Sequence, residues 1–473
     1  MEELVARCLV EERPRHRYGM HDLVRLYAAG RAREEDSGAE RAAAFDRLLE
    51  WCRDGVEAAA RVLYPENLRL APGQPRRDFA DQRQALDWLD AELPTLVAVA
   101  AHAARCRPRP EVWLLADSLR GYFVLRLRIR EWISVAESGL RVAEELDDQR
   151  AQGAMRHSLG LAYSRCGDSV AAQRHLRRAL ASHQSAQWPQ GCAAVLVCLG
   201  GAYFQQGQLG PAVDALEEAA EIAGRHGLAV QETAALGDLG EVCRDLGQFH
   251  RARDHQLAAI ARCKSLGMSR GEAVALANLG FVRVELGELG LAREHLDEAH
   301  RRFAALGSRD GEAYALIGLA AVDRGVGALS EALDLAERAV RDAESVDDSS
   351  LVVEALLARA EAARRLGRPA EAAADAERAS SLAAAQDYRR GLARACLELG
   401  AAELARDRDE PARQHCGRAV RLSREQGYRS TEAHATTLLA ELDARAGRAE
   451  DAAAHARTAL SAHRQTGHRA GEA

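Results

Sequence analysis

The sequence predicts an all-α fold in which antiparallel helix pairs stack along the chain into a superhelix. The first observation is an internal repeat of about 40 residues that runs from Met155 to the end of the chain, because a repeat of this length determines the architecture. The second is the composition, in which 47% of the residues are apolar and only 4% are aromatic, as in chains that pack helix against helix through small residues. The third is the length of 473 residues, which exceeds what one hydrophobic core usually holds.

Four positions of the repeat recur without a slip in eight consecutive units. A small residue opens the pattern at Gly160, Gly200, Gly240, Gly280, Ala320, Ala360, Gly400 and Ala440. A turn residue follows at Gly167, Gly207, Gly247, Gly287, Gly327, Gly367, Asp407 and Gly447. Two alanine series complete the units, namely Ala172, Ala212, Ala252, Ala292, Ala332, Ala372, Ala412 and Ala452, and Ala179, Ala219, Ala259, Ala299, Ala339, Ala379, Ala419 and Ala459.

The spacing suggests a structural role for each position. A small residue at the Gly160 position lets the neighbouring helix approach closely, and a glycine at the Gly167 position can adopt the left-handed conformation that ends a helix. The two alanines are separated by about two helical turns, so they share one face of the second helix. Each unit is therefore expected to be one antiparallel helix pair.

The skeleton Leu159-Gly160-x-x-Tyr163, Gly167 and Ala172-x3-Leu176-x2-Ala179 resembles the tetratricopeptide repeat. That family usually has a period of about 34 residues, so this chain is expected to be a long-helix variant. The resemblance implies a right-handed superhelix whose concave groove is lined by the first helix of each unit. HEAT-type repeats, with a period of about 40–47 residues, are a minor alternative that lacks this skeleton.

Residues 1–36 differ from the repeats and are expected to be the remnant of a winged-helix fold. Leu4 to Val10 is a short apolar stretch, Glu11 to His16 contains a turn signal, and Arg17 to Met20 is expected to be a returning strand. His21 and Asp22 then open an amphipathic helix.

The segment from Arg17 to Ala28 resembles the end of the nucleotide-binding module of STAND-class NTPases. The resemblance is closest to the actinobacterial regulators of the antibiotic-regulatory-protein type, in which an NB-ARC module precedes helical repeats. Met20-His21-Asp22 matches the Met-His-Asp motif of that family, whose histidine faces the phosphates of the nucleotide. Residues 86–104 and Arg130-Glu131-Trp132 are similar to the segment that follows in those regulators.

The chain lacks the phosphate-binding loop that such a module requires. That loop has the pattern G-x-x-x-x-G-K-[S/T], whereas the only lysine, Lys264, lies in a repeat helix without the glycines. We therefore expect no nucleotide and no other cofactor, and His21 would sense a nucleotide only if a nucleotide-binding module lies upstream. The chain is expected to be a piece of a longer regulator or a split-off relative of one.

Two further segments are expected between the winged-helix remnant and the regular repeats. Residues 37–110 are expected to form a helical adaptor that is interrupted by a proline-containing loop from Tyr64 to Arg77. Residues 111–150 are expected to be a degenerate first repeat, in which Arg120 replaces the small residue. Residues 151–470 then form eight tetratricopeptide-like repeats.

Composition and charge argue against several classes of protein. The net charge of −7 argues against nucleic-acid binding by this chain alone, and no apolar run reaches the ~20 residues of a membrane span. Ten cysteines without a C-x-x-C pair indicate reduced core residues rather than disulfides or a zinc site. Since the N-terminus also lacks a secretory signal, we expect a cytoplasmic protein without membrane contacts.

No catalytic or metal-binding pattern stands out. Five histidines share one repeat position but have no second ligand beside them, so ordinary helix-surface histidines explain them better than a metal ladder: His175, His255, His295, His415 and His455. Carboxylate pairs such as Glu144-Glu145 fall near helix ends, and no nucleophile motif occurs. We therefore expect a protein without enzymatic activity, catalytic residues or a metal site.

The concave groove is the expected binding surface for a protein or peptide partner. An extended peptide or a partner helix would fit such a groove, and arginines can pair with carboxylates of the partner. By repeat position, the groove is expected to contain His157, Arg165, Gln205, Glu241, Arg244, Asp245, Phe281, Glu285, Arg324, Arg364 and Arg365.

These features favour a non-enzymatic protein-interaction module, which the resemblance identifies with the sensor or effector repeat arm of a STAND-type transcriptional regulator. A free-standing tetratricopeptide scaffold or peptide-binding receptor is the alternative. DNA binding through the winged-helix remnant ranks last.

The repeat pattern also leads to a prediction about the C-terminal end. Gly471-Glu472-Ala473 has the phase of a new repeat opening, and a solenoid normally ends in a polar cap. We expect residues 448–473 to be frayed or to mediate self-association, as measured by hydrogen–deuterium exchange. Uniformly slow exchange through this segment in a monomer would contradict the prediction.

Overall fold

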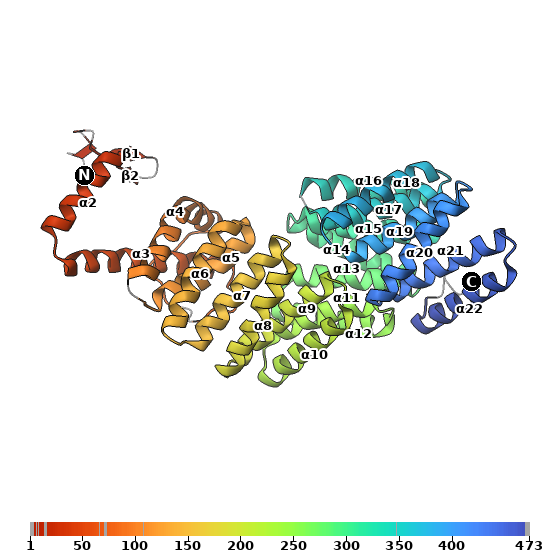
Figure 1. Cartoon of the computed structure of the whole chain (residues 1–473), viewed down its shortest axis with the longest axis horizontal. Coiled ribbons are helices and arrows are strands. Elements are labelled where there is room, and N and C mark those ends of the chain that lie inside the picture. Colours follow the sequence, from red (N-terminus) through yellow and green to blue (C-terminus); the bar gives the residue numbers. More distant parts are fainter. Residues whose placement is uncertain are drawn as a thin grey trace. The chain divides into compact units, whose positions relative to one another are not determined.

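The computed structural model describes residues 4–468 except 6, 8, 14–16, 66, 71, 72, 107 and 347. The chain divides into two compact units, Met1–Ala151 and Gln152–Ala473. The described residues contain 21 helices and two short strands (Figure 1), so the predicted all-α fold of stacked helix pairs is confirmed. The finer division of the chain at residues 36, 110 and 150 stays a prediction.

The first unit begins with a hairpin and a helix. The second strand and the helix lie where the sequence predicted them, whereas the first strand occupies part of the stretch that was predicted to be a turn. Strand β1 (Glu11–Arg13) pairs with β2 (Arg17–Gly19) in antiparallel register, and Glu12 lies opposite Tyr18. Helix α2 (Asp22–Glu35) follows, and the side chain of His21 caps it by accepting a hydrogen bond from the backbone N–H of Leu23. Residues 14–16 of the predicted turn lie outside the described residues.

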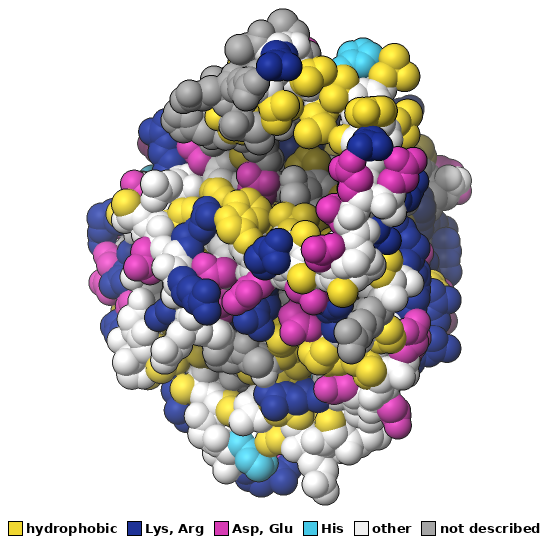
Figure 2. Space-filling model, turned by 90° about the vertical axis from the view of Figure 1, so that its left-hand side faces the viewer, with side chains coloured by type: hydrophobic (Ala, Val, Ile, Leu, Met, Phe, Trp, Pro, Cys, Tyr) yellow, Lys and Arg dark blue, Asp and Glu magenta, His cyan; other side chains and the backbone are white. Residues whose placement is uncertain are grey.

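Helix α2 has no buried residues. Its apolar side chains Leu23, Leu26 and Tyr27 are each about two-thirds exposed. Figure 2 shows hydrophobic side chains exposed at the end of the molecule where Figure 1 places α2.

Four longer helices complete the first unit: α3 (Gly38–Leu63), α4 (Gln82–Cys106), α5 (Glu111–Arg126) and α6 (Ile129–Glu145). Ser37 and Glu40 form a reciprocal capping box at the start of α3. Helices α3 and α4 pack closely, because a Cβ on Gly55 would lie 2.3 Å from the ring of Trp88. The predicted loop between these helices is held by buried polar contacts, in which the Glu57 carboxylate pairs with Arg69 and accepts from Ser118.

The second unit consists of helix pairs in which each helix is 16 to 18 residues long. Their bounds are α7 (Gln149–Arg165), α8 (Ser169–Ser185), α9 (Pro189–Gln205), α10 (Leu209–His226), α11 (Ala229–Asp245), α12 (Phe249–Leu266), α13 (Ser269–Glu285), α14 (Leu289–Ala305), α15 (Arg309–Val326), α16 (Leu329–Ser345), α17 (Ser349–Arg365), α18 (Pro369–Ala385), α19 (Arg389–Leu404), α20 (Asp409–Gln426), α21 (Arg429–Arg445) and α22 (Ala449–Thr466).

The turn residue of each unit adopts the left-handed conformation that the sequence predicted. Gly167 has a φ of 82°, and the corresponding glycines of the later units are also positive. Asp407, which replaces glycine in the seventh unit, adopts a φ of 56° at some cost in conformational energy. The residues that open the expected ninth unit, 471–473, lie outside the described residues.

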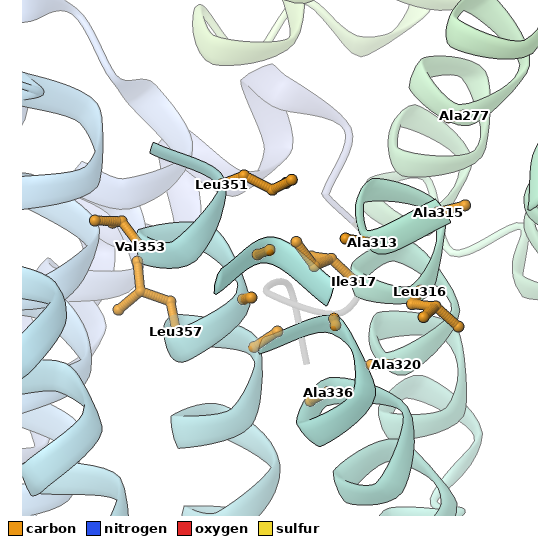
Figure 3. Close-up of a cluster of buried hydrophobic side chains, with 14 of the residues drawn as sticks. Ala277, Ala313, Ala315, Leu316, Ile317, Ala320, Ala336, Leu351, Val353 and Leu357 are labelled. Carbon is orange, nitrogen blue, oxygen red and sulfur yellow. The ribbon is translucent and has the colours of Figure 1, made fainter. Parts of the chain in front are cut away.

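The small residue that opens each unit allows the two helices of the pair to touch. A Cβ on Gly200 would lie 2.4 Å from Cγ of Leu216, and one on Gly280 would lie 2.5 Å from Cγ of Leu296. The alanines of both series are almost all fully buried. Figure 3 shows the result around Ala313 and Ala320 on α15, Ala336 on α16 and Leu357 on α17, whose side chains form part of one continuous core.

The later helices of the second unit lie against its earlier ones. Leu209 on α10 and Val242 on α11 share a buried cluster with Ala393 on α19 and Tyr428. The Gly247 turn lies next to Thr466 at the end of α22, since a Cβ there would be 2.3 Å from Cγ2 of Thr466. The superhelix therefore brings segments about 200 residues apart into contact. In an open repeat array, by contrast, each helix pair contacts only the pairs next to it in the sequence.

Two further predictions from the sequence concern the state of the cysteines and the presence of membrane-spanning helices. The nine described cysteines are free, and six of them are buried; Cys8 lies outside the described residues. In the part of the chain that the structure covers, no helix combines the length and the apolar character needed to cross a bilayer.

The helix contact at Gly200 can be tested against its neighbour Gly201, where an added Cβ would have no other atom within 4 Å. Gly200→Ala is expected to destabilise the protein by about 1–3 kcal/mol, because the new methyl group displaces Leu216. Gly201→Ala is expected to be neutral or to stabilise α9 by up to about 1 kcal/mol. Thermal unfolding followed by circular dichroism measures both, and equal effects would contradict the packing role.

Candidate functional site

A cavity of the second unit, hereafter the groove, lies among the first helices of successive pairs. Its volume is about 570 Å³, within the range of ligand-binding pockets. It is lined mainly by the first helices of six successive pairs, α11, α13, α15, α17, α19 and α21. The lining contains six arginines, five carboxylates and two histidines, so it carries many ionisable groups for a surface that is largely shielded from water.

Ion pairs between neighbouring helices connect these charges. Arg324 on α15 pairs with Glu361 on α17, and Arg364 on α17 pairs with Glu398 on α19 at 2.6 Å. Arg394 on α19 pairs with Glu354 on α17.

One further ion pair joins helices that are distant in the sequence. Arg390 on α19 lies 3.1 Å from the carboxylate of Asp245 on α11. Both side chains are mostly buried, so removal of one charge would leave the other without compensation in a poorly solvated place.

The pKa values of the groove carboxyls reflect this crowding. Burial alone would raise the pKa of Glu354, but Arg394, Arg390 and the Tyr388 hydroxyl lower it to about 2. Burial raises the pKa of Glu398 to about 7, against the attraction of Arg364 and with a contribution from Glu361. The ion pairs thus favour the charged form of Glu354, whereas burial favours the protonated form of Glu398.

The structure places seven of the eleven predicted groove residues in the lining: Arg244, Asp245, Phe281, Glu285, Arg324, Arg364 and Arg365. The guanidinium of Arg244 lies over the ring of Phe281 at 5.3 Å. The other four, His157, Arg165, Gln205 and Glu241, are not part of the lining. His157 is buried with Nε2 3.3 Å from Sγ of Cys198, and Glu241 accepts a hydrogen bond from Asn278.

Sequence reasoning missed a second set of lining residues that also follows the repeat. Tyr314, Glu354, Arg394 and His434 occupy the same position in four successive units, and all four line the groove. They lie about two helical turns before the Glu361 position, so they extend the same helix face. Their shared position in the repeat could have predicted that they lie on the same face, although the four side chains differ in chemistry.

The histidines of the predicted surface series remain apart from this site. His295 Nδ1 lies 2.7 Å from the carbonyl oxygen of Leu291 on its own helix, and His455 lies 2.8 Å from Asp443. His434, in contrast, lies in the groove. Burial, followed by the neighbouring His468 and His463, lowers the pKa of His434 to about 3.

Comparison with known families agrees with the architecture. The tetratricopeptide repeat model matches residues 230–305 and 271–345. The chain is similar over 125 residues, at 36% identity, to the regulatory protein AfsR of Streptomyces coelicolor. This match covers 24% of the chain and 12% of the relative, so the chain spans only a small part of that protein's length.

Among solved structures, a Rap protein complexed with Competence and Sporulation Factor has a similar fold, with a TM-score of 0.56 at 12% identity. The likeness covers 72% of this chain and 97% of the other. A STAND protein with a tetratricopeptide repeat sensor from Pyrococcus horikoshii matches at 13% identity with a TM-score of 0.42, over 79% of this chain and 64% of the other. The first similarity establishes the fold, whereas the TM-score of the second is too low to support any further conclusion.

These findings support a scaffold of stacked helix pairs of the tetratricopeptide type. The groove gives this scaffold a concave surface with charged and aromatic side chains.

The electrostatics of the groove can be tested at Glu354. The pKa of this carboxyl lies below its ordinary value of 4.5, so its charge stabilises the folded state above pH 4.5, and this contribution is lost as the pH falls toward 2. Glu354→Gln is expected to cost about 3 kcal/mol near neutral pH, and the difference from the wild type should shrink in acid. Denaturant unfolding at several pH values measures this; a difference independent of pH would contradict the assignment.

Proposed function

We propose that this chain is a non-enzymatic interaction module whose groove binds an extended segment of a partner protein or peptide through that segment's carboxylates. The observation that carries the proposal is a buried hydrogen-bond donor on a side chain that lines the groove. Within the described residues, Nη1 of Arg324, a side chain that lines the groove, is buried and has no hydrogen-bond partner. A buried donor without an acceptor is costly, and a carboxylate of a bound segment would satisfy it.

The shape and charge of the groove support the same proposal. Arginines outnumber carboxylates in the lining by six to five, and the Arg365 side chain, which is exposed, donates a hydrogen bond to the carbonyl oxygen of Arg324 at 2.7 Å. The exposed guanidinium of Arg365 can hold a carboxylate in bidentate geometry. The similar fold of the Rap protein that is complexed with Competence and Sporulation Factor indicates that such an architecture can hold a bound partner.

The wider role that we propose is the sensor or effector arm of a STAND-type transcriptional regulator in the cytoplasm. Support comes from the similarity to the regulatory protein AfsR and from the Met20-His21-Asp22 motif at the start of α2. In such a regulator, occupancy of the groove would bias the state of a nucleotide-binding module. A free-standing scaffold or peptide receptor would use the groove in the same way without that module.

The groove can be tested with peptides selected from a random display library on the wild-type chain. We expect selected peptides to carry Asp, Glu or a free C-terminal carboxylate. The double variant Arg324→Glu and Arg364→Glu should weaken their binding at least about tenfold, because each reversal removes a charge-assisted contact. Fluorescence anisotropy measures the affinity, and circular dichroism checks that the helices are retained.

The matched control reverses two arginines on second helices, Arg301→Glu and Arg341→Glu, which lie outside the groove lining. Since Arg324 and Arg364 hold ion pairs, Arg365→Glu serves as a second test that leaves those pairs intact. Selected peptides that bind the control and both groove variants equally would refute the groove as the binding surface.

A further inference from the structure

Three histidines meet where the last helix pair reaches the groove. His434 lies on α21, His463 lies on α22, and His468 follows the end of α22. Their ring centroids are 4.8–5.1 Å apart. One nitrogen of each ring can be chosen so that all three lie within 4.8 Å of one another.

The cluster is enclosed rather than spread over the surface. His463 is only 1% exposed, and its Nε2 lies 3.4 Å from the hydroxyl of Thr437 on α21. His434 and His468 are partly buried and also line the groove. Imidazole rings that converge in this way, each from a different segment, present lone pairs to a common point when they are neutral.

We propose that His434, His463 and His468 form a binding site for a divalent transition-metal ion of the Zn²⁺ type. Three imidazole ligands with an open fourth position are a known arrangement for tetrahedral zinc, and nitrogen donors favour zinc, copper and nickel over magnesium and calcium.

The distances agree with this assignment after small side-chain rotations. Zn–N bonds of about 2.0–2.1 Å place tetrahedral ligand nitrogens about 3.3 Å apart, whereas the present separations extend to 4.8 Å. His468 follows the last turn of α22, whose C-cap is Gly467, so its ring can approach the other two without displacing a helix.

A carboxylate lies next to the three imidazoles. Oε2 of Glu285, on α13, is 3.6 Å from Nε2 of His468. Metal-bound histidines usually donate their second ring N–H to a carboxylate or carbonyl oxygen, which orients the ring and strengthens binding. Glu285 is placed for this function, and it would link α13 to the C-terminal helix pair through the metal site.

The test uses the full chain, produced without a histidine tag and stripped of metal with a chelator. Titration with ZnSO₄ in competition with a chromogenic chelator is expected to give one tight site per chain, and Zn²⁺ should raise the unfolding temperature by mass action. Co²⁺ in place of Zn²⁺ should show the intense visible absorption of four-coordinate cobalt. His434→Ala and His468→Ala should each weaken Zn²⁺ binding at least about tenfold, and Glu285→Gln about tenfold.

His226→Ala is the matched control, because His226 is exposed near the end of α10 and belongs to no cluster of potential metal ligands among the described residues. It should bind Zn²⁺ as the wild type does. His468→Ala changes a residue outside the helices, so circular dichroism should show an intact fold and separate loss of metal from loss of structure. Zn²⁺ affinity that is unchanged in His434→Ala and His468→Ala, or a Co²⁺ spectrum of six-coordinate type, would overturn the proposal; neither result depends on the occupant of the groove.

Discussion

The close approach of the two helices within each pair is the constraint on which the rest of the second unit depends. A side chain at the Gly160 position would collide with the second helix, as the 2.6 Å distance from a Gly160 Cβ to Cγ of Leu176 indicates. Gly240 faces a different partner, since Gln256 takes the place of leucine and donates its amide to the carbonyl oxygen of Gly237. Small residues at this position let the two backbones of a pair approach closely.

Closely packed pairs stack into a superhelix, and the path of that superhelix determines the binding surface. The helices α19 and α21 come close to α10, α11 and α12, so the concave side becomes a cavity rather than an open face. Charges that would be solvated on an isolated helix pair are then largely shielded, and they remain charged only because arginines and carboxylates from neighbouring helices pair with one another. The groove therefore depends on these ion pairs as well as on shape.

The approach of the last helices to the earlier ones also explains why the groove and the histidine cluster lie next to each other. His434 belongs to the helix position that also provides Tyr314, Glu354 and Arg394, while His463 and His468 come from the end of the last described pair. A metal held there would add a cross-link between α21, the end of α22 and, through Glu285, α13. Metal affinity and the stability of the C-terminal helix pair would then be coupled, because ligands brought together by folding bind more tightly than ligands of an unfolded segment.

The sequence by itself determined the all-α class, the helix pairs, their turns and the face of each first helix that carries polar residues, because these follow from a local period and from the conformational range of glycine. It also identified seven residues of the groove lining, from Arg244 to Arg365. Only the tertiary structure decided that His157 and Glu241 lie outside the lining, that Arg390 meets Asp245, and that three histidines from separate segments converge. The contact between Arg390 and Asp245 joins residues far apart in the chain, and it depends on the accumulated rotation from one helix pair to the next. The histidines converge through side-chain packing at the end of one helix pair. A local repeat pattern specifies neither.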